Sequence, residues 1–178
     1  MIAVVAILVI GAALFLFSRQ TTTPSSPAEV SQAPNTQTTT DTEVSESPPP
    51  GFQGKVLAGD LPYVFDFVKS DYDQALKSDN LIVLYFYANW CPICREEIPK
   101  FYEAFNEMSK DSNKYVKVIG FRVNYNDSDT DDDEKTLARE YGIAYQHTKV
   151  FIKNGQRVLK SPESWDKDRY LSEINKAL

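Results

Sequence analysis

Residues 81–88, LIVLYFYA, are apolar almost without interruption. A strand covered on one face alternates apolar and polar residues, whereas a continuous run of this length indicates a strand that is buried on both faces. Such a strand requires helices on both sides of its sheet. The stretch therefore predicts an α/β fold built around a central strand.

The remainder of residues 55–178 supports this prediction, because strand and helix patterns follow each other along the chain. Strands are expected at 63–67, 81–88 and 115–123, and a hairpin at 148–160 around an Asn154-Gly155 turn. Helices are expected at 70–80, 95–111, 131–142 and 166–178. In the second of these helices, apolar residues recur at helical spacing and the charged residues are placed on the opposite face. We expect a mixed sheet flanked by helices.

The N-terminal part of the chain has a different composition. Residues 2–17 are all apolar or glycine, a run of 16 residues compared with the roughly 20 that span a bilayer as a helix. A cleaved signal peptide would have a basic start and a small-residue cleavage site, and neither is evident. We therefore predict an uncleaved transmembrane anchor at 1–18. A signal peptide whose start is misassigned is the alternative.

Residues 19–54 are rich in Ser, Thr and Pro and contain little that a core could bury. This composition predicts a disordered linker between the anchor and a folded domain at 55–178. Arg19 follows the apolar run, and a basic flank favours the cytoplasmic side. The stalk-like linker favours the opposite side, and we expect a single-pass protein whose domain is extracytoplasmic.

The charge balance excludes one class of partner. The net charge is −6 at pH 7 and the pI is about 4.9, which is the opposite of the basic footprint that nucleic-acid-binding domains carry.

The two cysteines, Cys91 and Cys94, are the only ones in the chain. Cys91 follows the central strand, and Cys94 lies in the first predicted turn of the next helix. Backbone N–H groups at a helix start stabilise a thiolate, and cysteines so placed have pKa values of about 3.5–7.5. The pattern predicts thiol–disulfide exchange. A structural zinc site would need four Cys or His ligands, and a disulfide closing so short a loop would add little stability.

The sequence around the cysteines resembles the thioredoxin family. Trp90 precedes the first cysteine, Pro99 follows the second by five residues, and REYGI…TKVFIKNG is similar to the family's KYGI…PTLLLFKNG. The resemblance spans about residues 60–178 and implies a thioredoxin-like fold and a protein-disulfide oxidoreductase without a cofactor. It also implies protein thiol or disulfide substrates that dock on Trp90, Pro92 and Ile93. The predicted anchor adds an expected electron donor or acceptor in the membrane.

The first departure from the family pattern is His147, which takes the place of the family's cis-proline beside the cysteines. Without proline the preceding peptide bond is expected to be trans. Three roles stay open for His147: a polar loop residue, an imidazolium that lowers the Cys91 pKa, or a third ligand for Cu(I) or zinc. The last role gives the alternative function, a copper- or zinc-binding chaperone that uses Cys91, Cys94 and His147.

A second departure concerns proton transfer. Where the family buries an aspartate as the base for the second thiol, this chain has Tyr85, and a phenol with a pKa of about 10 is a poor base at neutral pH. The proton of Cys94 must therefore leave through water, His147 or another group. Arg122 takes the place of the family's nearby lysine, and it can stabilise a thiolate but accept no proton.

A third departure is the acidic loop at 124–134. The spacing of Asp127, Asp129 and Asp131 resembles a calcium loop, but the positions that need Gly and Glu hold Asp132 and Ala138. We interpret the segment as a solvated loop that leads into a helix.

Overall fold

The computed structural model describes residues 49–178. The predicted anchor at 1–18 and residues 19–48 of the predicted linker lie outside these described residues. Within 49–178, no helix is both long and apolar enough to span a membrane.

The described chain contains six strands and five α-helices, with one short 3-10 turn. The strands are β1 (Val56–Ala58), β2 (Val64–Asp66), β3 (Leu81–Tyr87), β4 (Val118–Asn124), β5 (Thr148–Lys153) and β6 (Gln156–Ser161). The helical segments are α1 (Lys69–Leu76), α2 (Pro92–Met108), η1 (Ser109–Asp111), α3 (Ser112–Tyr115), α4 (Asp132–Glu140) and α5 (Lys167–Ala177).

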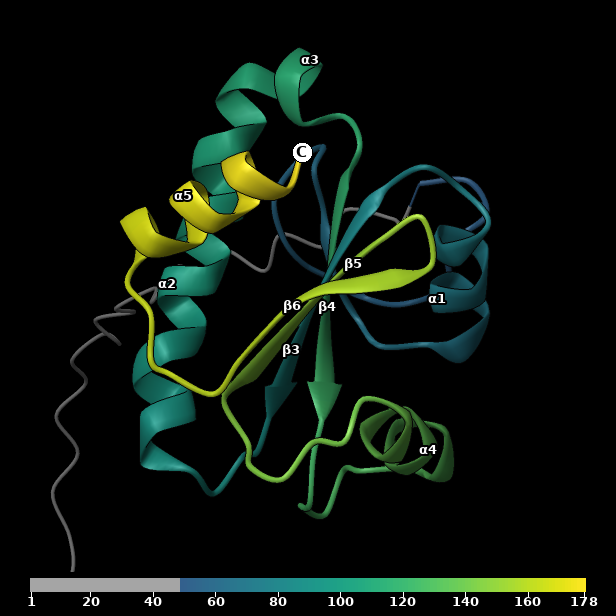
Figure 1. Cartoon of the computed structure of the whole chain (residues 1–178), viewed down its shortest axis with the longest axis vertical. Helices are drawn as coiled ribbons and strands as arrows, with labels where there is room; N and C mark the ends of the chain where they lie inside the picture. Colours follow the sequence, from purple (N-terminus) through teal and green to yellow (C-terminus); the bar gives the residue numbers. More distant parts are fainter. Residues whose placement is uncertain (1–48) are drawn as a thin grey trace, which may run out of the picture. The chain divides into compact units, whose positions relative to one another are not determined.

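The strands form one mixed sheet in the order β1-β2-β4-β3-β5-β6. The inner strands β2, β4 and β3 are parallel, and β5 and β6 add an antiparallel hairpin beside β3. Helices α2 and α5 lie on one side of the sheet, and α1 and α4 lie on the other (Figure 1). The predicted α/β fold with a mixed sheet and flanking helices is confirmed.

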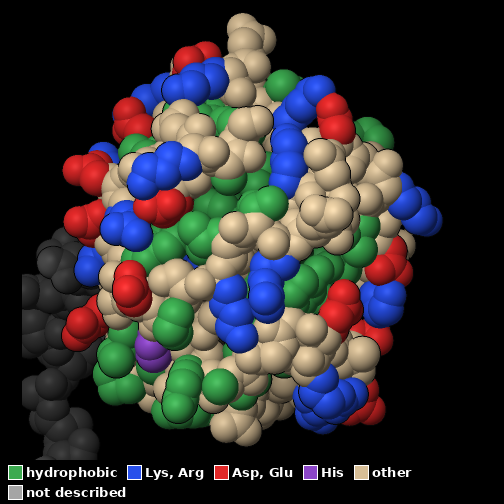
Figure 2. Space-filling view, viewed as in Figure 1, with side chains coloured by type: hydrophobic (Ala, Val, Ile, Leu, Met, Phe, Trp, Pro, Cys, Tyr) green, Lys and Arg blue, Asp and Glu red, His purple; other side chains and the backbone are tan. Residues whose placement is uncertain are grey.

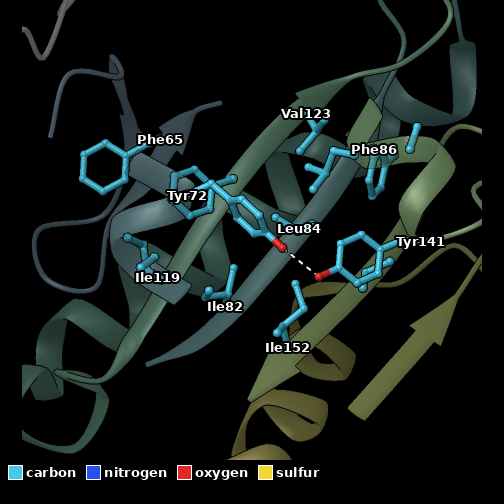
Figure 3. Close-up of a cluster of buried hydrophobic side chains, with 14 of the residues drawn as sticks. Phe65, Tyr72, Ile82, Leu84, Phe86, Ile119, Val123, Tyr141 and Ile152 are labelled. Carbon is cyan, nitrogen blue, oxygen red and sulfur yellow. Dashed lines mark hydrogen bonds between the residues drawn. The ribbon is translucent and has the colours of Figure 1, made fainter. Parts of the chain in front are cut away.

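Strand β3 is the central strand that residues 81–88 predicted. Six of its seven residues are buried, and its side chains point alternately into two hydrophobic clusters, one on each face of the sheet. Tyr72 of α1 and Tyr141, just after α4, join the first cluster, where their hydroxyl groups hydrogen-bond at 2.7 Å (Figure 3). A continuous apolar strand is stable here because each face has its own cover of helices.

The turns and helix ends follow local signals in the sequence. Asn154 and Gly155 both have positive φ, as a type I′ hairpin turn requires. Helix α4 begins with a capping box between Asp131 and Glu134 and ends before Gly142, which has a φ of 59°. The predicted hairpin and helix stop are confirmed.

The structure differs from the predictions in several places, and helix α1 ends at Leu76 instead of residue 80. Strand β1 was not predicted, because a three-residue edge strand is too short to show a periodicity. Strand β4 begins at Val118, since the preceding residues turn in η1 and α3. Two residues assigned to the linker also contact the domain: Phe52 stacks on Phe65, with ring centroids 4.9 Å apart, and the Gly54 N–H donates to Asp71 at 2.7 Å.

Candidate active site

Cys91 is placed by the junction between β3 and α2. It is the N-cap residue of α2, and its Sγ accepts a hydrogen bond from the backbone N–H of Cys94 at 3.3 Å. Pro92 occupies the first turn of the helix, where its missing N–H has no cost. The predicted position of the sulfur atom at a helix start is therefore present in the structure.

The two cysteines are free thiols whose pKa values are shifted in opposite directions. Burial raises the pKa of Cys91, but hydrogen bonds from Cys94, Gln146 and Ile93 outweigh it, so that the pKa lies below its usual value. Burial raises the pKa of Cys94 to about 11, and the neighbouring Cys91 adds to the shift. The lower pKa makes Cys91 the more readily ionised thiol of the pair, and the raised pKa keeps Cys94 protonated near neutral pH.

This asymmetry predicts two separate titrations in the reduced chain. Because a thiolate forms above its pKa, thiolate absorbance near 240 nm should rise first for Cys91, below the usual cysteine value of about 8.5. Cys94 should follow only near pH 11. In Cys91→Ser the Cys94 midpoint should fall, since the neighbouring thiolate no longer raises it. Two overlapping midpoints near 8.5 would contradict the assignment.

The surface around the cysteines is apolar and exposed. Trp90 and Ile93 are 50% and 45% exposed, and Tyr145, from the loop before β5, is 65% exposed. Pro92 is exposed between the cysteines. Figure 2 shows hydrophobic side chains gathered around the single histidine on this part of the surface. The three residues predicted to form a docking surface are therefore accessible to a partner.

Tyr85 is fully buried on β3 and is no base. Burial raises its pKa far above the usual phenol value, and the neighbouring Glu97 and Cys94 raise it further. Its hydroxyl donates to the Glu97 carboxylate at 3.3 Å. Tyr85 therefore interacts with both the Cys94 thiol and the Glu97 carboxylate.

Glu97 itself was predicted on the charged face of its helix, and that prediction is wrong. It is only 1% exposed, and its Oε1 accepts hydrogen bonds from Lys149 Nζ at 2.7 Å, from Tyr170 at 2.8 Å and from the Trp165 backbone at 2.9 Å. The spacing of α2 contained the signal, because Glu97 lies three residues after Cys94 and four before Phe101, on the buried stripe. Glu97 thus joins Tyr85, Lys149, Tyr170 and the Trp165 backbone in one buried polar cluster.

Lys149 is the cation that pairs with Glu97, and its side chain has no exposed surface. Burial lowers its pKa, and the hydrogen bond to Glu97 opposes that shift. Nζ also donates to the backbone carbonyls of His147, at 2.9 Å, and of Glu163, and lies 5.0 Å from the Trp165 ring centroid. Lys149 is the second residue of β5, and the three residues that follow it, Val150 to Ile152, are apolar and buried.

Arg122 is paired with a carboxylate on the adjacent strand. Its Nη2 donates to both carboxylate oxygens of Asp66, at 2.9 and 3.0 Å, and its guanidinium lies over the Tyr87 ring. Its charge is therefore neutralised by Asp66 on the adjacent strand β2. The lysine beside the buried thiol is Lys149, from β5.

His147 lies where the resemblance placed it, directly before β5. The Leu61-Pro62 bond is the one cis peptide in residues 49–178, so the bond before His147 is trans, as predicted. Burial lowers the pKa of His147 and the charge of Lys149 lowers it further, which disfavours the imidazolium role. Ligand atoms of Cys91, Cys94 and His147 all lie within 4.8 Å of one another.

The acidic loop is attached to the active-site loop. Asp127 accepts a hydrogen bond from the Asn89 backbone at 2.8 Å, and the Asn126 carbonyl accepts from Trp90 Nε1 at 2.9 Å. Asp131 is used in the cap of α4. Within residues 49–178, the acidic loop contains no group of three metal-ligating side chains that come close together.

Comparison with known proteins gives consistent matches. A protein-family model described as Thioredoxin matches residues 63–176. Thioredoxin H4 of Arabidopsis thaliana is 37% identical over 89 residues, which cover 49% of this chain and 64% of that relative. Thioredoxin-T of Drosophila melanogaster is 35% identical over 89 residues, which cover 49% of each chain. This chain thus spans less than two thirds of either relative.

Among solved structures, thioredoxin f from spinach chloroplast is similar, with a TM-score of 0.52 and 25% identity. The match covers 66% of this chain and 95% of that one. The family match includes the whole parallel part of the sheet, the cysteine pair and the hairpin.

Proposed function

Because this chain belongs to the thioredoxin family, we propose that it is a membrane-tethered thiol–disulfide oxidoreductase acting on protein thiols and disulfides outside the cytoplasm. The observation that carries the proposed activity is the unequal cysteine pair. Cys91 caps α2 with a lowered pKa, and Cys94 lies buried three residues later with a raised one.

The proposed reaction is two successive exchanges. The Cys91 thiolate attacks one sulfur of a substrate disulfide, forming a mixed disulfide and expelling the other sulfur as a thiolate that takes a proton. Cys94 then loses its proton and attacks Cys91 Sγ, which breaks the mixed disulfide and releases the second substrate thiol. The substrate gains two electrons and two protons, and the chain is left with a Cys91–Cys94 disulfide. The reverse sequence oxidises a substrate dithiol.

The geometry favours a protein as the substrate. Apolar surface is presented by Trp90, Ile93 and Tyr145 beside Cys91, a residue that is itself only 2% exposed. A partner must cover this surface to reach Cys91, and aromatic residues supply much of the energy of such contacts.

The proposed membrane tether is inferred from the amino-acid sequence that precedes the described residues. The apolar run at 2–17 and the Ser/Thr/Pro-rich segment after it are the composition of an anchor and a stalk. A tethered enzyme of this kind would exchange electrons with a donor or acceptor in the same membrane.

Trapping of substrates tests the proposed activity. In cells that express the full chain with Cys94→Ala, the mixed disulfide cannot resolve, so Cys91 should remain joined to partner proteins. Non-reducing electrophoresis should show adducts that a reductant removes. The matched control is Cys91→Ser with Cys94→Ala, which should show none. Adducts of equal amount in the control would contradict the proposal.

Labelling of intact cells tests the proposed location. A thiol reagent that does not cross membranes should modify the reduced chain in intact cells, and the chain should stay in the membrane fraction after alkaline washing. Cys91→Ser with Cys94→Ala gives the labelling background. Labelling that appears only after lysis would place the domain in the cytoplasm, and release by the wash together with a shortened N-terminus would favour a cleaved signal peptide.

A further inference from the structure

Two thiols and an imidazole converge at the start of α2. In residues 49–178, Cys91, Cys94 and His147 are the one group of three such residues whose ligand atoms come close enough to share an ion, all within 4.8 Å of one another. The sulfur atoms come from the first turn of a helix, and the imidazole comes from the loop before β5. The three donors thus face one point from two separate segments.

The imidazole has a free coordinating atom. His147 Nδ1 is buried and has no hydrogen-bond partner in the structure. Buried polar atoms are nearly always paired, so an orphan nitrogen needs an explanation in a ring that has a ligand atom within 4.8 Å of both sulfur atoms. A metal ion bound by the thiolates would supply the missing partner.

The backbone holds this residue in place. His147 has a φ of 53°, which is uncommon for a residue other than glycine. Its N–H donates to the Phe86 carbonyl at 2.6 Å, and its carbonyl accepts from the buried Lys149 at 2.9 Å. Two hydrogen bonds to the core therefore maintain an unfavourable backbone conformation at the residue whose ring lies near the cysteines.

We propose that the reduced chain binds one Cu(I) ion through Cys91 Sγ, Cys94 Sγ and the His147 imidazole. Thiolates are soft ligands that select Cu(I) or zinc over Mg²⁺ and Ca²⁺. Structural zinc takes four protein ligands, whereas only three donors converge in the described part of the chain. Three donors suit Cu(I), which is stable with low coordination numbers.

The bound ion and the disulfide are alternative states of the same sulfur atoms. Coordination replaces the two thiol protons, which pass to solvent, and changes no oxidation state. Reduction of a substrate disulfide to two thiols takes two electrons from the pair, converts it to the Cys91–Cys94 disulfide and releases the ion. The proposal does not depend on disulfide exchange, because a chain that exchanges no disulfide can still hold the ion.

Competition for Cu(I) tests the proposal. The full chain, fully reduced and free of oxygen, is titrated against a Cu(I)–bicinchoninate complex. We expect one ion per chain, and X-ray absorption with two sulfur neighbours and one nitrogen neighbour. His147→Asn should weaken binding at least tenfold and remove the nitrogen neighbour, while asparagine tolerates the positive φ. Glu96→Ala, at an exposed residue of α2, should bind as the unmodified chain does.

Several results would overturn the assignment. These are equal affinity in His147→Asn, one ion shared by two chains, or binding of Zn²⁺ without binding of Cu(I). Circular dichroism of both variants checks that the fold is intact. The substrate-trapping experiment is separate, so that a failure of exchange and a failure of metal binding can be told apart.

Discussion

Replacing Glu97 by alanine should destabilise the domain by about 3–5 kcal/mol, the usual cost of leaving one member of a buried ion pair without its partner. The Lys149 ammonium would be left without its partner in a site where its side chain has no exposed surface. The Tyr170 hydroxyl and the backbone N–H of Trp165 would lose their acceptor. Since small domains are stable by only about 5–15 kcal/mol, this loss is large. Urea unfolding at neutral pH measures it.

The matched control is Glu96→Ala, because Glu96 is the adjacent residue on α2 and is exposed. It should change the stability by less than about 0.5 kcal/mol. Replacing Glu97 and Lys149 together by methionine should recover part of the loss, because no buried charge is then left alone. Equal and small effects of Glu97→Ala and Glu96→Ala would show that the pair does not stabilise the fold.

Replacing Cys91 by serine should reduce disulfide exchange at least about a thousandfold, as removal of a nucleophile does in other enzymes. A hydroxyl is not ionised near neutral pH and forms no mixed disulfide, so the remaining Cys94, buried and with a pKa of about 11, cannot replace it. The rate of reduction of insulin disulfides by dithiothreitol, with and without the chain, measures the effect.

Serine is also a favourable N-cap residue, so Cys91→Ser should leave α2 and the urea midpoint intact. That separates lost chemistry from lost folding. Cys94→Ser should still form one mixed disulfide per chain and then stop. If Cys91→Ser retained most of the rate and Cys94→Ser lost it, the assignment of nucleophile and resolving thiol would be reversed.

Much of the fold could be predicted because its signals are local. The apolar run of β3, the Asn154-Gly155 turn and the acidic start of α4 each act within a few residues, and the structure contains each of them. The position of Cys91 at a helix start was predicted in the same way. Strand β1 could not be predicted, because it exists only through its pairing with β2.

The surroundings of the cysteines were less accessible to prediction. The resemblance placed His147 beside the pair, and the structure agrees, but the unpaired Nδ1 became visible only in three dimensions. Arg122 was considered for the thiolate because of its position in the family pattern. In the structure, Arg122 forms an ion pair with Asp66 on the adjacent strand.

The amino-acid order alone determined where a strand passes into a helix and which sulfur atom caps that helix, because backbone geometry and capping involve neighbours in the chain. Only the tertiary structure decided which charges are buried together. Glu97 and Lys149 lie 52 positions apart, and no local pattern distinguishes a carboxylate that meets an ammonium from one that meets water. Burial depends on which elements pack together, and that is a property of the whole sheet and its helices.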